Sequence, residues 1–140
     1  MKIMVSACLL GRNCKYNGGN NKNEALLKFL EGHEVIPICP ETEGGLKTPR
    51  KPAEIVGERV MTRCGDDVTR EYKKGAETAL ERAFLESPDL CILQSRSPSC
   101  GVNKIYDGSF TGKLKEGSGI TAVLLRDNCF KVIDIEDFKG

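Results

Sequence analysis

Cysteines are the residues of this 140-residue chain best suited to chemistry, and there are seven of them. Cys8 and Cys39 directly follow apolar runs that begin at Ile3 and Val35, and Cys100 lies in the loop after a third run. If these runs are neighbouring parallel strands, their ends share one edge of a sheet and the three thiols converge there. Three converging thiolates suit a soft metal, with zinc and iron–sulfur clusters as leading candidates, and the alternative is ordinary buried cysteines.

The spacing of the cysteines favours a cluster over a closed zinc site. Structural zinc sites usually draw on paired ligands such as Cys-x-x-Cys, and this chain contains no such pair. With three protein ligands, a four-iron cluster keeps one iron open, and an open iron can act as a Lewis acid. Because the cysteine count is odd, we expect several free thiols or metal ligands instead of a disulfide scaffold.

The other four cysteines have weaker cases. Cys91 lies within an apolar run and Cys129 at the start of another, so we expect both to be small core residues. Cys64 is expected to be a loop thiol without an obvious partner. Cys14 follows Cys8 closely enough to reach the same patch as a fourth ligand, a resolving thiol or a structural residue, and we favour the last.

Polar residues flank two of the three candidate ligands. Glu41 comes two residues after Cys39 and should lie at the same sheet edge as the three thiols. It is either a general acid or base or a solvated loop carboxylate. Ser97 and Ser99 stand on either side of Pro98, where turn formation explains them simply. The alternative for the two serines is proton donation or a hydrogen bond to substrate.

A loop after Glu41 has the features of a shaped substrate-binding segment. Gly44 and Gly45 permit tight turns, and we expect Arg50 to direct its charge inward against substrate, although a solvated arginine is the alternative. The only histidine, His33, stands just past a predicted helix end, which weakens a Cys–His hydrolase interpretation. Gly18–Asn21 fits neither the Walker nor the dinucleotide-binding pattern.

Composition narrows the class of protein further. Lys and Arg number 21 against 20 Asp and Glu, and a formal net charge of +1 argues against a broad basic field for a nucleic-acid polymer. No apolar run approaches the ~18 residues of a membrane span. The first residues lack the features of a secretory signal, so we expect a cytoplasmic protein with a small-molecule substrate.

The elements that must position these residues alternate between apolar runs and helical periods. Strands are predicted at Lys2–Ala7, Glu34–Cys39, Arg59–Thr62, Leu90–Leu93 and Phe130–Ile133. Helices are predicted at Asn23–Glu31, Asp67–Glu86 and Gly119–Arg126, the last capped by Ser118. Such alternation implies right-handed crossovers. We therefore predict the α/β class, with residues 1–140 forming a single three-layer Rossmann-like domain around a largely parallel sheet.

Four ordered motifs give the chain a resemblance to a known family over nearly its whole length. They are Val5–Gly11 with Cys14 and Tyr16; Cys39-Pro40-Glu41 with Gly44-Gly45-Leu46 and Pro49-Arg50; Ser97–Gly101; and Gly119–Ala122. Together they resemble the thiouracil desulfidase family. Lys15 and Asn17 depart from the expected Arg and Asp, and both lie outside the proposed ligand set.

The resemblance implies a cofactor, a reaction and roles for residues. It implies a 4Fe-4S cluster held by Cys8, Cys39 and Cys100, whose open iron binds the sulfur of a thiolated pyrimidine and which aerobic handling is expected to remove. Water or hydroxide then replaces the sulfur, and hydrosulfide leaves. Glu41 is implied as the acid or base and Ser97 as a proton donor or substrate contact, with Ser99 a further candidate.

Two other functions compete with this enzyme hypothesis. One is a non-catalytic module that binds a cluster or metal as a sulfur or redox sensor. The other is a cluster-free thiol enzyme in which Cys8 or Cys100 is the nucleophile. Iron and sulfide counting after anaerobic purification separates the thiol enzyme from the others, and hydrosulfide release from thiouracil separates an enzyme from a sensor.

Overall fold

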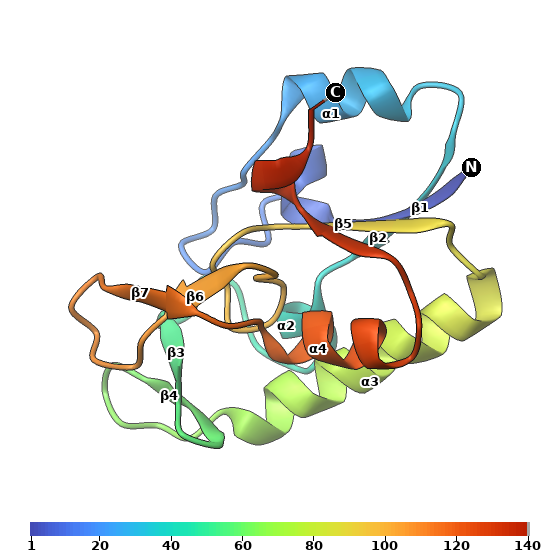
Figure 1. Cartoon of the computed structure of the whole chain (residues 1–140). Coiled ribbons are helices and arrows are strands. Elements are labelled where there is room, and N and C mark those ends of the chain that lie inside the picture. Colours follow the sequence, from blue (N-terminus) through green and yellow to red (C-terminus); the bar gives the residue numbers. More distant parts are fainter. Residues whose placement is uncertain (140) are drawn as a thin grey trace.

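A four-stranded parallel sheet forms the centre of the protein. The computed structural model describes residues 1–139 and is drawn in Figure 1. The sheet has the order β2-β1-β5-β8, and each neighbouring pair of strands is parallel. Its strands are β1 (Lys2–Ser6), β2 (Glu34–Ile38), β5 (Leu90–Leu93) and β8 (Val132–Asp134). The predicted α/β class with a largely parallel sheet is therefore confirmed.

Helices cover both faces of this sheet and give three layers. Figure 1 shows α1 (Glu24–Leu30) on one face, with α2 (Pro40–Glu43), α3 (Thr69–Glu86) and α4 (Ile120–Asp127) on the other. Successive side chains of β1 point to opposite faces of the sheet. Ile3 and Val5 pack in the cluster under α1, whereas Met4 packs in the cluster under α3 and α4. Strands buried on both sides in this way are typical of parallel sheets.

Local sequence explains where the helices begin and which face they bury. The Asn23 side chain caps α1 by accepting a hydrogen bond from the Leu26 amide at 2.9 Å. Along α3, buried residues recur every three or four positions and form a single face, made by Tyr72, Gly75, Ala76, Ala79 and Ala83. Small residues dominate that face, so the backbone of α3 lies close to the elements beneath it.

Two antiparallel hairpins lie beyond the ends of the parallel strands. One joins β3 (Ala53–Val56) to β4 (Arg59–Thr62), and the other joins β6 (Lys104–Tyr106) to β7 (Leu114–Glu116). Figure 1 shows both on the side to which the central strands run. Short 3-10 turns complete the described chain at Ala7–Leu10 and Ile135–Asp137.

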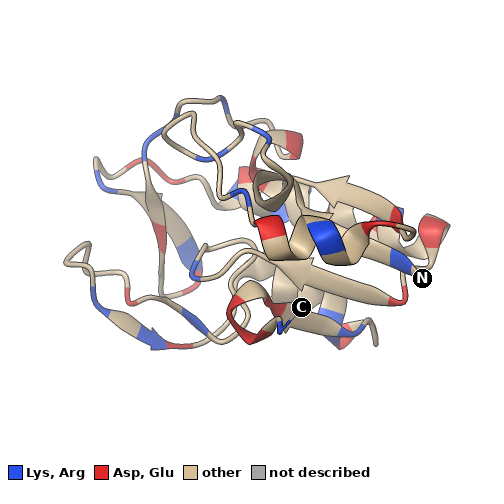
Figure 2. Ribbon diagram, turned by 90° about the horizontal axis from the view of Figure 1, so that it is seen from above, with Lys and Arg blue, Asp and Glu red and all other residues tan. Residues whose placement is uncertain are grey.

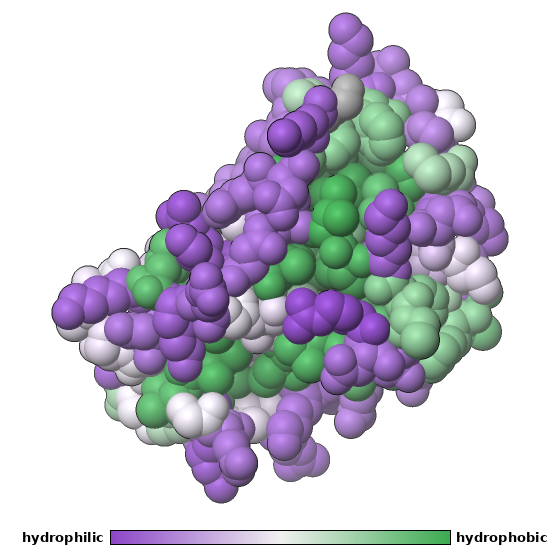
Figure 3. Space-filling model, viewed as in Figure 1, coloured by the Kyte–Doolittle hydropathy of each residue, from purple (hydrophilic) through white to green (hydrophobic). Residues whose placement is uncertain are grey.

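The surface carries mixed charges and one apolar area. Lys and Arg are interspersed with Asp and Glu over the described elements (Figure 2), as the formal net charge of +1 leads one to expect. Apolar side chains gather in the middle of the face on which β8 and α4 lie, with polar borders (Figure 3). Within residues 1–139, no helix has both the length and the apolar character needed to cross a membrane.

Two local predictions were wrong. Ser118 does not cap α4, because Gly119 occupies the N-cap and the Ser118 hydroxyl donates to the Val102 carbonyl. Cys129 is exposed, not a core residue, because it turns the chain between α4 and β8 with a positive φ of 70°. Cys91, by contrast, is fully buried in the core as predicted.

Candidate functional site

A cavity of about 620 Å³ opens where the central strands end. Cys8 follows β1, Cys39 is the N-cap of α2 after β2, and Cys100 lies in the loop after β5. All three line this cavity, together with Cys14. The predicted convergence of three distant thiols is therefore confirmed, and it follows from β1 lying between β2 and β5 in the sheet.

Hydrogen-bond donors accompany the sulfur atoms of Cys8 and Cys100. The Asn21 side-chain amide donates to Cys8 Sγ at 3.6 Å, and Ser99 Oγ lies 3.6 Å from Cys100 Sγ. Burial raises the pKa of Cys8 and raises the pKa of Cys100 to about 12. Both thiols are therefore protonated at neutral pH in the metal-free chain, and binding of a metal would release their protons.

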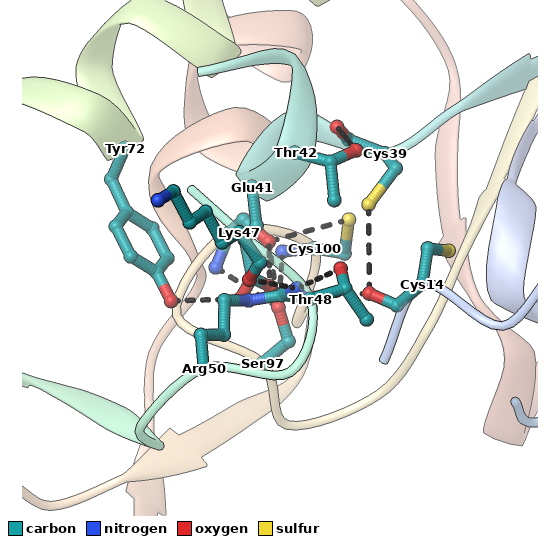
Figure 4. A network of polar contacts seen from close by, with 11 residues as sticks. Cys14, Cys39, Glu41, Thr42, Lys47, Thr48, Arg50, Tyr72, Ser97 and Cys100 are labelled. Atoms are coloured by element: carbon teal, nitrogen blue, oxygen red, sulfur yellow. Dashed lines mark hydrogen bonds and ion pairs between the residues drawn. The ribbon is translucent and has the colours of Figure 1, made fainter. Parts of the chain in front are cut away.

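Cys14 stands beside Cys39 at the wall of the cavity. The Cys39 thiol lies 3.9 Å from the carbonyl oxygen of Cys14 (Figure 4). Hydrogen bonding between the two thiols raises the pKa of Cys14 and lowers the pKa of Cys39. The structure thus places Cys14 at the site with the three predicted ligands.

Glu41 is held by three side chains inside the cavity. Tyr72 Oη donates to Glu41 Oε1 at 2.8 Å, and Arg50 Nε donates to the same oxygen at 3.3 Å. The Ser99 hydroxyl donates to the other carboxylate oxygen at 2.9 Å. The side chains of Glu41 and Arg50 are only 16% and 9% exposed, so this ion pair is shielded from solvent. The carboxylate is therefore fixed and directed into the cavity, as Figure 4 shows.

Ser97 and Ser99 have different surroundings. Ser97 Oγ accepts hydrogen bonds from the amides of Ser99 and Cys100 at 3.0 and 2.9 Å, and it contacts the Ser99 hydroxyl at 2.8 Å. Ser97 thereby organises the turn that presents Cys100. The amide of Thr121, in the first turn of α4, donates to the Ser99 carbonyl at 2.9 Å and fixes the same loop from behind.

Arg50 reaches inward, as predicted from the loop composition. Its guanidinium contacts Glu41 and also donates to the Cys14 carbonyl through Nη2 at 2.8 Å and to Thr48 Oγ1 through Nη1 at 2.9 Å. The backbone amide of Arg50 donates to the Tyr16 carbonyl at 2.7 Å. This one residue therefore connects the carboxylate to the loop that carries Cys14.

Gly44 and Gly45 lie elsewhere than the substrate-binding prediction expects. Neither is among the residues that line the cavity. Gly44 ends α2 against α3, where a Cβ would collide with the Glu71 carbonyl oxygen, and Gly45 turns the chain with a φ of +103°. Their role in this structure is the close packing of two helices and a tight turn, because only glycine fits either position.

The sequence interpretation missed Tyr72 and Asn21 as site residues. Tyr72 counts in the helical period as one more apolar residue, although a tyrosine in a face otherwise made of small residues signals a hydroxyl that needs a partner. Asn21 belongs to the Gly18–Asn21 loop, which fits neither the Walker nor the dinucleotide-binding pattern and so gives no signal of a site residue. Asn21 instead makes two contacts with Cys8. Its side-chain amide donates to Cys8 Sγ, and its backbone amide donates to the Cys8 carbonyl at 2.9 Å.

The donor set fits an iron–sulfur cluster better than a single ion. Four thiols and no histidine line the cavity, and thiolates select zinc, copper(I) and iron–sulfur clusters. His33 lies instead at the end of α1, where Nδ1 meets the N-terminal ammonium at 3.0 Å. Within residues 1–139, no three Cys, His, Asp or Glu side chains are grouped closely enough to hold one metal ion. Thiols spread around a cavity suit a larger polynuclear group.

Fold and site together define a parallel α/β protein with a cysteine-lined site for a soft-metal cofactor beside a fixed carboxylate. The family model described as 2-thiouracil desulfurase matches residues 3–137. The chain belongs to this family, and the resemblance read from its four motifs is confirmed.

Two similar proteins extend over almost the same length. A protein of Bacillus subtilis (strain 168) described as uncharacterized protein YbbK is 40% identical over 141 residues, which cover 94% of this chain and 93% of that protein. A solved structure described as the [4Fe-4S]-dependent thiouracil desulfidase TudS is 42% identical, with a TM-score of 0.92. That match covers 98% of this chain and 92% of the solved chain, so the two share one fold.

Proposed function

We propose that this protein is an iron–sulfur-dependent desulfidase that converts a small thiolated heterocycle, such as thiouracil, to the oxo base and hydrosulfide. The observation that carries the proposal is the meeting of Cys8, Cys39 and Cys100 in one cavity beside Glu41. Family membership and the likeness to a [4Fe-4S]-dependent thiouracil desulfidase support it.

In this proposal Cys8, Cys39 and Cys100 hold a 4Fe-4S cluster. When bound, the cluster supplies a Lewis acid. Because soft iron prefers sulfur to carbonyl oxygen as a ligand, it selects sulfur as the leaving group. Asn21 orients the Cys8 sulfur, and the Ser99 hydroxyl contacts the Cys100 sulfur. Such outer contacts fix the ligands that surround a metal centre.

Glu41 is the proposed general base. Replacing a C=S bond by C=O with one water consumes H₂O and releases H₂S, so protons must move from the attacking oxygen to the departing sulfur. The Glu41 carboxylate takes the proton of the water, and the Ser99 hydroxyl at 2.9 Å offers a path for it toward Cys100 and the sulfur side of the cavity. Tyr72 and Arg50 hold the carboxylate in place during the transfer.

A cluster-free thiol enzyme with Cys8 or Cys100 as its nucleophile is less compatible with the surroundings of these two cysteines. Burial raises the pKa of both Cys8 and Cys100, which keeps these two thiols protonated and poorly nucleophilic. A site that needs reduced thiols also fits a cytoplasmic protein, where disulfides are rare. We propose accordingly that the chain works as a single Rossmann-like domain in the cytoplasm on a small molecule.

The test is anaerobic reconstitution of Cys39→Ser beside the wild-type chain. Wild-type protein should bind about four irons and four sulfides per chain, develop a brown chromophore, and release hydrosulfide from thiouracil. Cys39→Ser should lose both chromophore and turnover. Cys64→Ser is the matched control, because Cys64 is exposed and outside the cavity lining, and it should behave as wild type. Full turnover by Cys39→Ser would reject the ligand assignment.

A further inference from the structure

One thiol of the cavity has no role in the proposed reaction. Cys14 lies on a loop that two backbone-directed contacts of Arg50 hold in place, at the Cys14 carbonyl (2.8 Å) and the Tyr16 carbonyl (2.7 Å). The loop that carries Cys14 is therefore held in a fixed position beside Cys39. The same arginine that orients Glu41 also fixes Cys14 at the wall of the site.

The Cys39 side chain meets the backbone of Cys14. Cys39 Sγ lies 3.9 Å from the Cys14 carbonyl oxygen. Figure 4 shows the Cys39 sulfur directed at the Cys14 backbone. Both residues are partly exposed and line the open cavity, whereas Cys100 is buried. Small oxidants can therefore reach this pair of sulfur atoms.

We propose that Cys14 and Cys39 are a redox modification site: in cluster-free protein a hydroperoxide converts them to a disulfide, which withholds Cys39 from the cluster until a dithiol reduces it. The inference rests on the proposed function in one respect, because it takes Cys39 to be a cluster ligand. Disulfides form between cysteines that lie close together in the fold, and here the Cys39 sulfur contacts the Cys14 backbone while both residues line one cavity.

The chemistry balances in two steps. The Cys39 thiolate attacks the O–O bond of the hydroperoxide, so that an S–O bond forms, the O–O bond breaks, and the departing alkoxide takes a proton to become the alcohol. Cys39 is oxidised to the sulfenic acid by two electrons, and the peroxide is reduced. The Cys14 sulfur then attacks the Cys39 sulfur, so that the S–S bond forms and the S–O bond breaks. The departing hydroxide and the Cys14 proton leave as water.

The pair would protect the site during the time it lacks its cluster. A sulfenic acid without a neighbouring thiol proceeds to the irreversible sulfinic acid under further peroxide. Cys14 intercepts Cys39 before that step, and a dithiol then restores both residues by exchange.

Peptide mapping of peroxide-treated, cluster-free wild-type protein is the first test. Trypsin cleaves after Arg12, so Cys8 falls in the peptide 3–12, Cys14 in 13–15 and Cys39 in 29–47. We expect a disulfide-linked pair of 13–15 and 29–47 that disappears on treatment with dithiothreitol. A pair of 3–12 and 29–47 in its place, or no linked peptide, would overturn the proposal.

Recovery after oxidation is the second test. Peroxide-treated wild-type protein should regain the iron content of its untreated sample after dithiothreitol and reconstitution. Cys14→Ser should not, because its Cys39 accumulates as the sulfinic acid, which mass spectrometry of peptide 29–47 detects. Cys129→Ser is the control, because it removes an exposed thiol that does not line the cavity, and it should recover like wild type. Equal recovery by Cys14→Ser contradicts the inference.

The two proposals fail in different ways. Disulfide mapping needs neither cluster nor turnover, so it reports on Cys14 and Cys39 even if the reduced chain binds no iron. A fully reduced protein that binds no cluster would reject the proposed function, whereas a cluster-binding protein without the linked peptides would reject only the redox pair.

Discussion

At the scale of single residues, Glu41 is the point where orientation and proton transfer can be separated. The carboxylate receives three hydrogen bonds, from Tyr72, Arg50 and Ser99. In Glu41→Gln, the amide keeps the size and one acceptor oxygen but cannot act as a base. We expect hydrosulfide release to fall about 10²–10⁴-fold with unchanged iron content. A stopped assay of hydrosulfide beside an iron count measures both.

Glu43 offers a matched control on the same short helix. It pairs with Arg82 at 3.4 Å and does not line the cavity, and burial raises the pKa of its carboxyl. Glu43→Gln should therefore leave the rate of hydrosulfide release close to that of wild type. If Glu43→Gln slows the reaction as much as Glu41→Gln, the loss reflects damage to α2, and Glu41 is not the base.

The sequence was sufficient to predict that Cys8, Cys39 and Cys100 converge, but not to find the residues that orient the carboxylate. Cys8 and Cys39 directly follow apolar runs, and the carboxyl edge of a parallel sheet brings such positions together. Tyr72 could not be found in that way, since its distance from Glu41 along the chain spans a hairpin and a loop of irregular path. Only the folded positions of α2 and α3 bring its hydroxyl to 2.8 Å from the carboxylate.

At the scale of elements, the contact between α2 and α3 positions the carboxylate. Gly75 of α3 lies against the backbone of Pro40, and a Cβ at this position would collide with the Pro40 carbonyl oxygen. Gly44 meets the Glu71 carbonyl in the same close fashion from the α2 side. Because α2 also carries Glu41 directly after Pro40, the separation of the two helices sets the depth of the carboxylate in the cavity.

Gly75→Ala tests this contact, because the expected change in the free energy of unfolding is opposite to the change that helix propensity predicts. In an ordinary helix interior, Ala stabilises relative to Gly by roughly 0.5–1 kcal/mol. Here the added methyl forces α2 away from α3, and we expect a loss of about 1–3 kcal/mol in the free energy of unfolding by urea, as for other overpacked sites. Glu77→Ala, at an exposed position of the same helix, should change stability little. An unchanged or raised stability in Gly75→Ala would show that the helices adjust freely.

Prediction from sequence succeeded for long or buried elements and failed for short exposed ones. α3 extends over Thr69–Glu86 against a predicted Asp67–Glu86, because its apolar period is sustained over several turns. The strands β3, β6 and β7 were missed. β7 has three residues, two of them exposed, so Leu114–Glu116 shows no alternation that could distinguish a strand from a loop.

At the scale of the whole molecule, the order of the strands in the sheet determines whether the three cysteines form one site. β1 pairs with β2 on one side and with β5 on the other, so three consecutive places at the sheet edge carry Cys8, Cys39 and Cys100. The sequence predicts the strands but not this order, which depends on how the crossovers pack on the two faces. Segments from far apart in the chain therefore assemble the site only when the sheet is complete, and ligand binding would stabilise the fold as a unit.

Buried thiols should make the metal-free fold sensitive to alkali. Burial raises the pKa of Cys91 and of Cys100 from 9.0 to about 12, so the folded chain keeps both protons after the unfolded chain has released them. The stability these thiols contribute is complete below pH 9 and is lost progressively as the pH rises toward about 12. Each thiol should steepen the fall in unfolding free energy by about 1.4 kcal/mol per pH unit over that window.

Cys91→Ala isolates one thiol from this alkaline response without touching the cavity. Cys91 lies in the core under α3 and α4 and is absent from the cavity lining, so its replacement should leave reconstitution intact. Urea unfolding at a series of alkaline pH values should give a variant that is less stable at neutral pH, because a buried side chain is shortened. Its stability should nevertheless fall less steeply with pH than that of wild type. Parallel curves for the two proteins would show that ionisation of Cys91 is not coupled to unfolding.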